Sequence, residues 1–168
     1  MDIQIDLKRK TSALPGIIDM YWHENKRVGL ERTLYHRFSI PLKPFDSGLE
    51  YDPQPMKTLI LVDWIKLELQ DPTQLDGLTL SSAANERVET SIYLGSAYNN
   101  CNIKRLNLKG MGTDIYCVDC DLFVDFAYEM VANPEDFSFA TELKLDRNIR
   151  PRPDQIPIRT YEDIRKQL

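Results

Sequence analysis

The stretch IYCVDCDLFVDFAYEM, residues 115–130, decides the fold because its apolar and polar residues alternate with a period of two. None of its even positions is charged, and all of its acidic residues stand at odd positions. Consecutive side chains of a strand point to opposite faces, so the pattern predicts one long strand whose even positions lie in a core.

Two cysteines, Cys117 and Cys120, lie at CxxC spacing within this stretch. Strand residues three positions apart point to opposite faces, which keeps the two sulfurs from meeting in a metal or redox site. Cys120 is therefore predicted to be a small hydrophobic core residue. Only a bulge between the two cysteines would change the face on which one of them lies.

The odd face of the same predicted strand carries a row of acidic residues around one aromatic side chain. The row consists of Asp119, Asp121, Phe123, Asp125 and Glu129. Carboxylates two positions apart on a strand lie roughly 6–7 Å apart. Four interpretations are open: a solvated face balanced by Lys or Arg on neighbouring strands, a docking face for a basic partner, a hard-cation site, or a pair of catalytic carboxylates.

Shorter alternating segments predict further strands, separated by turn-rich gaps that are typical of an antiparallel meander. The predicted strands lie within residues 2–8, 16–29, 30–40, 58–70, 87–98, 101–109 and 136–146. Segment 30–40 could instead form a helix, and 58–70 is ambiguous in the same way, with its odd positions expected to share one face. Asn99 and Asn100 are expected to form a turn, and the proline-rich stretch 41–56 a loop.

About eight or nine strands with little helix predict a mainly β fold, either an antiparallel β-sandwich or a flattened barrel, with a short C-terminal helix. Residues 1–146 are expected to form a single β-rich domain, which suits a chain of 168 residues. Residues 147–168 are expected to form a Pro/Arg-rich extension that ends in a helix, with Thr160 and Asp163 as a capping-box-type pair.

The overall charge and the cysteine count limit the function classes. A net charge of −5 disfavours general binding to nucleic acids or anionic membranes, which relies on Lys and Arg. The N-terminal stretch MDIQIDLKRK lacks the apolar segment of a signal peptide, and no apolar run approaches the length of a membrane helix. Three cysteines, an odd number, favour free thiols in a reducing compartment. These features predict a soluble cytoplasmic protein.

No catalytic or cofactor motif is present: the chain has no P-loop, GxGxxG, HExxH or GxSxG sequence, and no cofactor or metal is predicted. His36 is expected to be a hydrogen-bonded core histidine. The sequence predicts a non-enzymatic binding protein that engages a basic partner through the acidic row, with Phe123 as apolar anchor. In general character such a protein resembles bacterial immunity and inhibitor proteins, without a shared motif. The alternative is a carboxylate- or metal-dependent hydrolase that uses the same row, together with His23.

Overall fold

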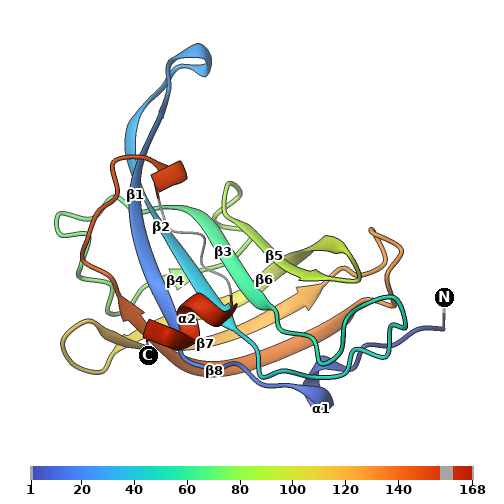
Figure 1. Cartoon of the computed structure of the whole chain (residues 1–168). Coiled ribbons are helices and arrows are strands. Elements are labelled where there is room, and N and C mark those ends of the chain that lie inside the picture. Colours follow the sequence, from blue (N-terminus) through green and yellow to red (C-terminus); the bar gives the residue numbers. More distant parts are fainter. Residues whose placement is uncertain (1, 156–160, 168) are drawn as a thin grey trace.

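In the computed structural model, which describes residues 2–155 and 161–167, one sheet curls until its two ends meet (Figure 1). Its strands are β1 (Gly16–Asn25), β2 (Leu30–Pro41), β3 (Leu59–Lys66), β4 (Thr79–Leu80), β5 (Glu89–Leu94), β6 (Ala97–Gly110), β7 (Ile115–Val124) and β8 (Glu135–Leu145). Around the ring the order is β6-β5-β3-β2-β1-β8-β7, and β7 pairs again with β6. The short strand β4 lies outside the ring and pairs with β6.

The prediction of a mainly β fold is confirmed, and of the two architectures the barrel is right and the sandwich is wrong. A sandwich needs two sheets, whereas the β6–β7 pairing closes a single sheet of seven strands. The expectation of purely antiparallel pairing is also wrong, because the start of β1, from Gly16 to Ile18, runs parallel to the end of β8. Gly16 begins β1 at this point, and a side chain there would overlap the carbonyl oxygen of Ser39.

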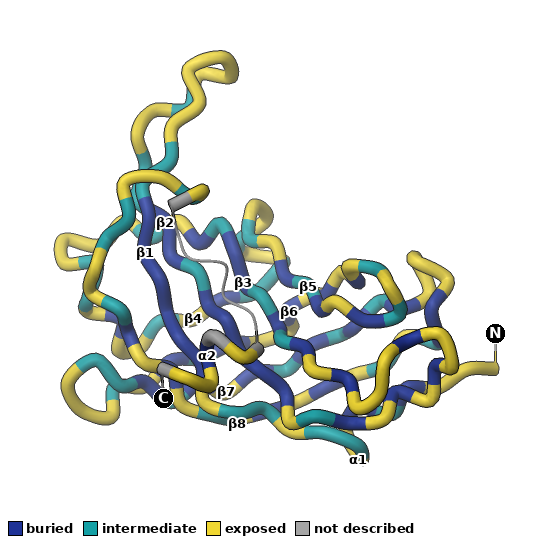
Figure 2. Tube along the Cα trace, in the orientation of Figure 1, coloured by how far each residue is buried: buried dark blue, intermediate teal, exposed yellow. Residues whose placement is uncertain are grey.

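The interior of the barrel is filled by one apolar face of each long strand. On β7 the predicted alternation is confirmed from Tyr116 to Val124, and Cys120 is fully buried. On β8 the predicted inner face is confirmed as well, from Phe137 to Leu145. Figure 2 shows buried residues alternating with more exposed ones along β7 and β8, whereas the outer part of the β1–β2 hairpin is exposed.

The long predicted strand 115–130 is wrong at its end, because β7 stops at Val124. Hydrogen bonds from Met130 N–H to the Ala127 carbonyl and from Val131 N–H to the Phe126 carbonyl fold the next residues into turns. Phe126 still points into the core, but Tyr128 and Met130, which the alternation placed there, are 73% and 79% exposed.

The prediction for β3 is right about the strand and wrong about its faces. The even residues Ile60 and Val62 point into the barrel instead of the odd ones. Trp64 has a φ of 57°, and the pairing with β2 shifts register nearby, so that Ile65 returns to the core. Apolar residues stand on both faces of this strand, and alternation alone therefore could not choose between them.

The turn between β5 and β6 lies at Gly95 and Ser96 instead of the predicted Asn99 and Asn100. Gly95 and Ser96 have positive φ values, 67° and 59°. A type I′ turn requires positive φ at both of its central residues, and its twist matches that of the two strands it joins. Asn99 belongs to β6, where its buried side-chain amide donates a hydrogen bond to the carbonyl of Leu94.

The predicted strand at residues 2–8 is also wrong. This segment makes a short helix, α1 (Leu7–Lys10), and inserts Ile5 and Leu7 into the core. The Glu135 carboxylate accepts hydrogen bonds from the backbone N–H groups of Asp6 and Leu7 at 3.0 and 2.7 Å. These two N–H groups therefore bond to a side chain instead of to a neighbouring strand.

The C-terminal extension packs against the outside of the barrel. Asp146 and Arg150 donate backbone hydrogen bonds to carbonyls of β1, and Trp22 N–H donates to the Arg150 carbonyl.

The short helices that complete the fold are η1 (Lys26–Val28), η2 (Pro153–Gln155) and α2 (Tyr161–Gln167). Helix α2 confirms the predicted C-terminal helix and buries Ile164, whereas the predicted cap, Thr160, lies outside the described residues.

A second, smaller cluster lies on the outer side of β1, β2 and β3. At its centre the buried Asp63 carboxylate accepts hydrogen bonds from the Tyr21 hydroxyl and the Arg37 guanidinium, both at 2.7 Å. Burial and the charge of Asp63 raise the pKa of Tyr21. Burial alone would lower the pKa of Arg37, but its hydrogen bond to Asp63 and the charge of that carboxylate outweigh the effect and raise it. The rings of Tyr35 and Trp64 pack around this group.

His36 is buried on β2, as predicted, with its Nε2 2.8 Å from the Pro72 carbonyl oxygen. Burial lowers its pKa, and the hydrogen bond to Pro72 offsets only part of that effect. The unfolded chain therefore binds a proton at a higher pH than the folded chain does. We expect the free energy of unfolding to fall as the pH drops below about 6.5, the ordinary histidine pKa. Denaturant titrations at neutral and mildly acidic pH should show a smaller loss for His36→Gln, and an equal loss would contradict this account.

Candidate functional site

The acidic row on β7 is paired with a cation from the neighbouring strand. Arg105 of β6 donates to both carboxylate oxygens of Asp119, at 3.0 and 3.2 Å, and to Asp121 at 3.0 Å. Hydrogen bonds from the Ser138 hydroxyl and from Arg105 lower the pKa of Asp121. Phe123 lies half-buried farther along β7, opposite Asp136 of β8.

The outer face of β6, β7 and β8 is balanced in charge. Its acidic residues are Asp119, Asp121, Asp136 and Glu142, and its basic residues are Lys104, Arg105, Lys109 and Lys144. Lys104 pairs with Asp136 at 2.6 Å, in addition to the Arg105 pairs. This arrangement matches the interpretation in which neighbouring strands supply the counter-charges of a solvated face.

Asp125 and Glu129 do not share this face, because the chain leaves β7 before it reaches them. The Asp125 carboxylate accepts a hydrogen bond from the backbone N–H of Tyr128, and Glu129 is exposed in the same turn. The structure thus separates the five predicted residues into two groups. Three remain on the balanced face of β7, and two lie at one end of the barrel.

That end of the barrel also gathers large exposed side chains. We call it the tyrosine end, and it comprises Tyr51, Tyr93, Tyr98, Tyr128 and Met130. The rings of Tyr93 and Tyr98 lie side by side on the β5–β6 hairpin, with centroids 4.8 Å apart. Tyr and Met are enriched at protein interfaces, where they supply large contact areas.

Three segments form the tyrosine end, and hydrogen bonds and close contacts join them: the loop 45–56, the hairpin residues 93–103 and the turn region 125–135 (Figure 1). Gly95 N–H of the hairpin donates to the Asp52 carboxylate at 2.8 Å. A side chain at Gly95 would collide with Val131 of the turn region and approach the Tyr51 hydroxyl. Asp125 N–H donates to the Asn100 carbonyl at 2.9 Å.

The same three segments are strongly acidic. Their sequences contain no Lys or Arg, and they carry Asp46, Glu50, Asp52, Asp125, Glu129 and Glu135. Asp52 and Glu135 accept hydrogen bonds from backbone N–H groups, as described above. Asp46, Glu50 and Glu129 are exposed. Lys10 of α1 reaches the loop at Gly48, but the three segments themselves add only acidic side chains to the aromatic contact area.

Sequence reasoning missed this surface because its parts are far apart in the chain. The absence of basic residues in each segment is visible in the sequence, but only the topology shows that the three segments meet. Tyr128 and Met130 were misplaced because the alternation of β7 continues past the point where the strand ends.

His23 lies on β1, away from the acidic row, with its ring 5.1 Å from that of Trp64. Among the described residues, no group of three or more His, Cys, Asp or Glu side chains is placed to hold a metal ion. The sequence alternative of a hydrolase drew on His23 together with the carboxylates, and the structure does not bring them together.

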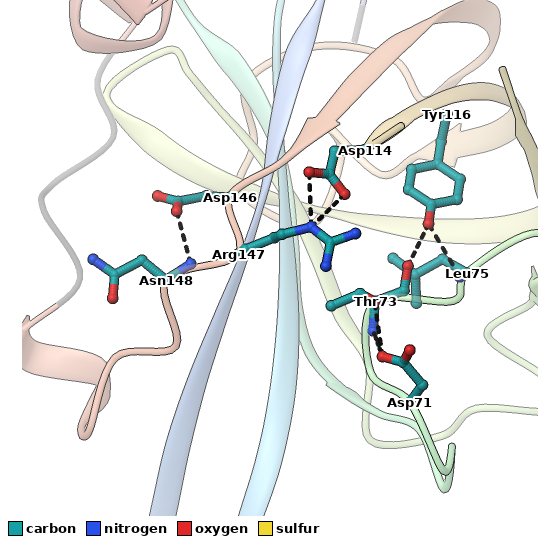
Figure 3. Close-up of polar contacts among 8 residues, drawn as sticks. All are labelled: Asp71, Thr73, Leu75, Asp114, Tyr116, Asp146, Arg147 and Asn148. Carbon is teal, nitrogen blue, oxygen red and sulfur yellow. Dashed lines mark hydrogen bonds and ion pairs between the residues drawn. The ribbon is translucent and has the colours of Figure 1, made fainter. Parts of the chain in front are cut away.

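The opposite end of the barrel has a polar hollow of about 390 Å³ beside Arg147. Figure 3 shows Arg147 Nε donating to both oxygens of Asp114, and the Tyr116 hydroxyl between Thr73 and Leu75. These contacts fasten the C-terminal extension and the loop after β3 to the β6–β7 turn. Their observed role is structural.

No protein-family model matches the chain, and no significant similarity to a curated protein or to a solved structure was found. Within the described residues, no helix has the length and apolar character required to cross a membrane.

Proposed function

We propose that this chain is a non-enzymatic binding protein that engages a basic protein partner through the tyrosine end. The observation that carries the proposal is the combination of five large exposed Tyr and Met side chains with acidic segments whose own sequences contain no Lys or Arg. Tyrosine side chains lose little conformational entropy on binding, and they accept cations on their ring faces. An immunity- or inhibitor-type role in the cytoplasm would suit such a surface, because it would cover a basic site on its target.

The tyrosine end suits this role better than the acidic row on β7. Arg105 already neutralises part of the charge of Asp119 and Asp121, so a basic partner would have to compete with it. Glu50 and Glu129 are exposed and flank exposed tyrosines. Complementary charges of this kind accelerate association and select against wrong partners.

Charge reversal tests the proposal. Immobilised wild-type protein should retain basic proteins that the double variant Glu50→Lys/Glu129→Lys retains at least tenfold less, because the reversed charges repel a basic surface. The control Glu86→Lys/Glu142→Lys makes the same change in net charge at exposed positions elsewhere and should behave as wild type. Equal retention by both double variants would contradict the proposal.

A further inference from the structure

The hairpin of β1 and β2 projects beyond the barrel as an arm, residues 22–34, on the side away from the tyrosine end (Figure 1). Residues 24–29, 31 and 32 are all exposed, so the outer part of the arm adds nothing to the barrel core. A two-stranded hairpin is only marginally stable by itself. Stability of the barrel therefore does not explain the length of the arm.

The tip of the arm is basic and forms a hydrogen-bonded 3₁₀ turn, η1. It carries Lys26 and Arg27 beside Val28, which is 74% exposed. The Asn25 side chain accepts a hydrogen bond from Arg27 N–H, and Gly29 N–H donates to the Lys26 carbonyl. Such a pre-formed tip loses little freedom when it binds.

Chemically, the tip and the tyrosine end complement each other. Lys26 and Arg27 match the exposed carboxylates Glu50 and Glu129, and a guanidinium packs well on a tyrosine ring. Val28 would supply an apolar contact in the centre. Glu24 and Glu31 lie lower on the arm, so the tip itself presents positive charge.

We infer that the arm of one molecule docks at the tyrosine end of a second copy of this chain. The two surfaces are different patches on one molecule, so the contact is heterologous and joins copies head to tail. The inference rests on the proposed function, since it uses the same end to accept a basic ligand. A foreign basic partner would compete with the arm, and binding it would release the second copy.

Sedimentation velocity of the full chain tests this inference. At about 0.1 M salt, where the Debye length is about 10 Å, the average mass should rise with protein concentration, and at about 1 M, where it is about 3 Å, it should return to the monomer. Lys26→Glu/Arg27→Glu should stay monomeric at both salt concentrations. The control Lys109→Glu/Lys144→Glu reverses two exposed cations on β6 and β8 and should self-associate as wild type does.

A charge-swap experiment tests whether the arm and the tyrosine end contact each other. Glu50→Lys/Glu129→Lys should also be monomeric alone, and mixing it with Lys26→Glu/Arg27→Glu should restore oligomers because each reversed surface complements the other. Wild-type protein that stays monomeric at low salt, or an arm variant that assembles as well as wild type, would overturn the inference. If the wild-type protein is monomeric while retention of basic proteins still depends on Glu50 and Glu129, the proposed function is supported and the self-association is wrong. If neither effect is seen, both are wrong.

Discussion

Asp63→Ala is expected to lower the free energy of unfolding by about 3–5 kcal/mol, the range for removing one partner of a buried ion pair. The carboxylate receives the Arg37 guanidinium, the Tyr21 hydroxyl and the backbone N–H of Trp64, each at 2.7 Å. Its loss leaves the buried Tyr21 hydroxyl without its acceptor and removes the carboxylate that is hydrogen-bonded to Arg37, so that Asp19 on β1 is the carboxylate that still attracts this guanidinium. Typical domains are stable by only about 5–15 kcal/mol, so a loss of this size is a large fraction of the free energy of unfolding.

Denaturant unfolding followed by tryptophan fluorescence measures this effect. Asp119→Ala is the matched control, because it also removes a carboxylate bound by Arg, but on an exposed face. The control should unfold at nearly the wild-type midpoint. If Asp63→Ala fails to fold, Asp63→Asn keeps one acceptor oxygen and should show an intermediate loss. A change of less than about 1 kcal/mol for Asp63→Ala would contradict the role assigned to this cluster.

Tyr98→Ala and Tyr128→Ala are each expected to weaken partner binding by about 2 kcal/mol, which is roughly a 30-fold loss of affinity. Tyr98 is 68% exposed beside Tyr93 on the hairpin, and Tyr128 stands in the turn after β7. Both side chains extend from the barrel, so their removal should hardly change the unfolding midpoint. Titration calorimetry with a protein retained in the pull-down gives the affinities.

Phe123→Ala distinguishes binding at the tyrosine end from the binding at the acidic row that the sequence predicted. Phe123 was predicted to be the apolar anchor of the acidic row, but it is half-buried on the charge-balanced face of β7. We expect its replacement to leave the affinity unchanged. If Phe123→Ala weakens binding while Tyr98→Ala does not, the binding surface lies on β7 and the tyrosine end is not the site.

Most of the strands could be predicted from the sequence because their inner faces alternate strictly. β7 up to Val124 and all of β8 follow this rule, and Cys120 was placed correctly on the core side for that reason. The errors arose where another interaction overrides alternation. Glu135 binds the backbone of the N-terminal segment, and the positive φ of Trp64 changes the face of β3.

Closure of the barrel could not be predicted, because it depends on the pairing of β1 with β8 and of β6 with β7, which are set by the whole sheet. The candidate site depends on that closure. The carboxylates Asp125 and Glu129 were identified in the sequence, but Tyr51 and Tyr98 join them only through the topology. Pairing of the acidic row with Lys or Arg on a neighbouring strand was one of four interpretations of the sequence. Arg105 could not be named, because no local pattern shows which residue faces Asp119 across the sheet.

Site-specific photo-crosslinking in cells would show directly whether the tyrosine end is a binding surface. A photoreactive phenylalanine analogue would replace Tyr98 at the tyrosine end in one variant and Ser138 on the balanced β8 face in another, both exposed positions. We expect crosslinks from position 98, to basic segments of a partner or to the arm of a second copy, and none from position 138. Crosslinks from position 138 with none from position 98 would contradict the proposal.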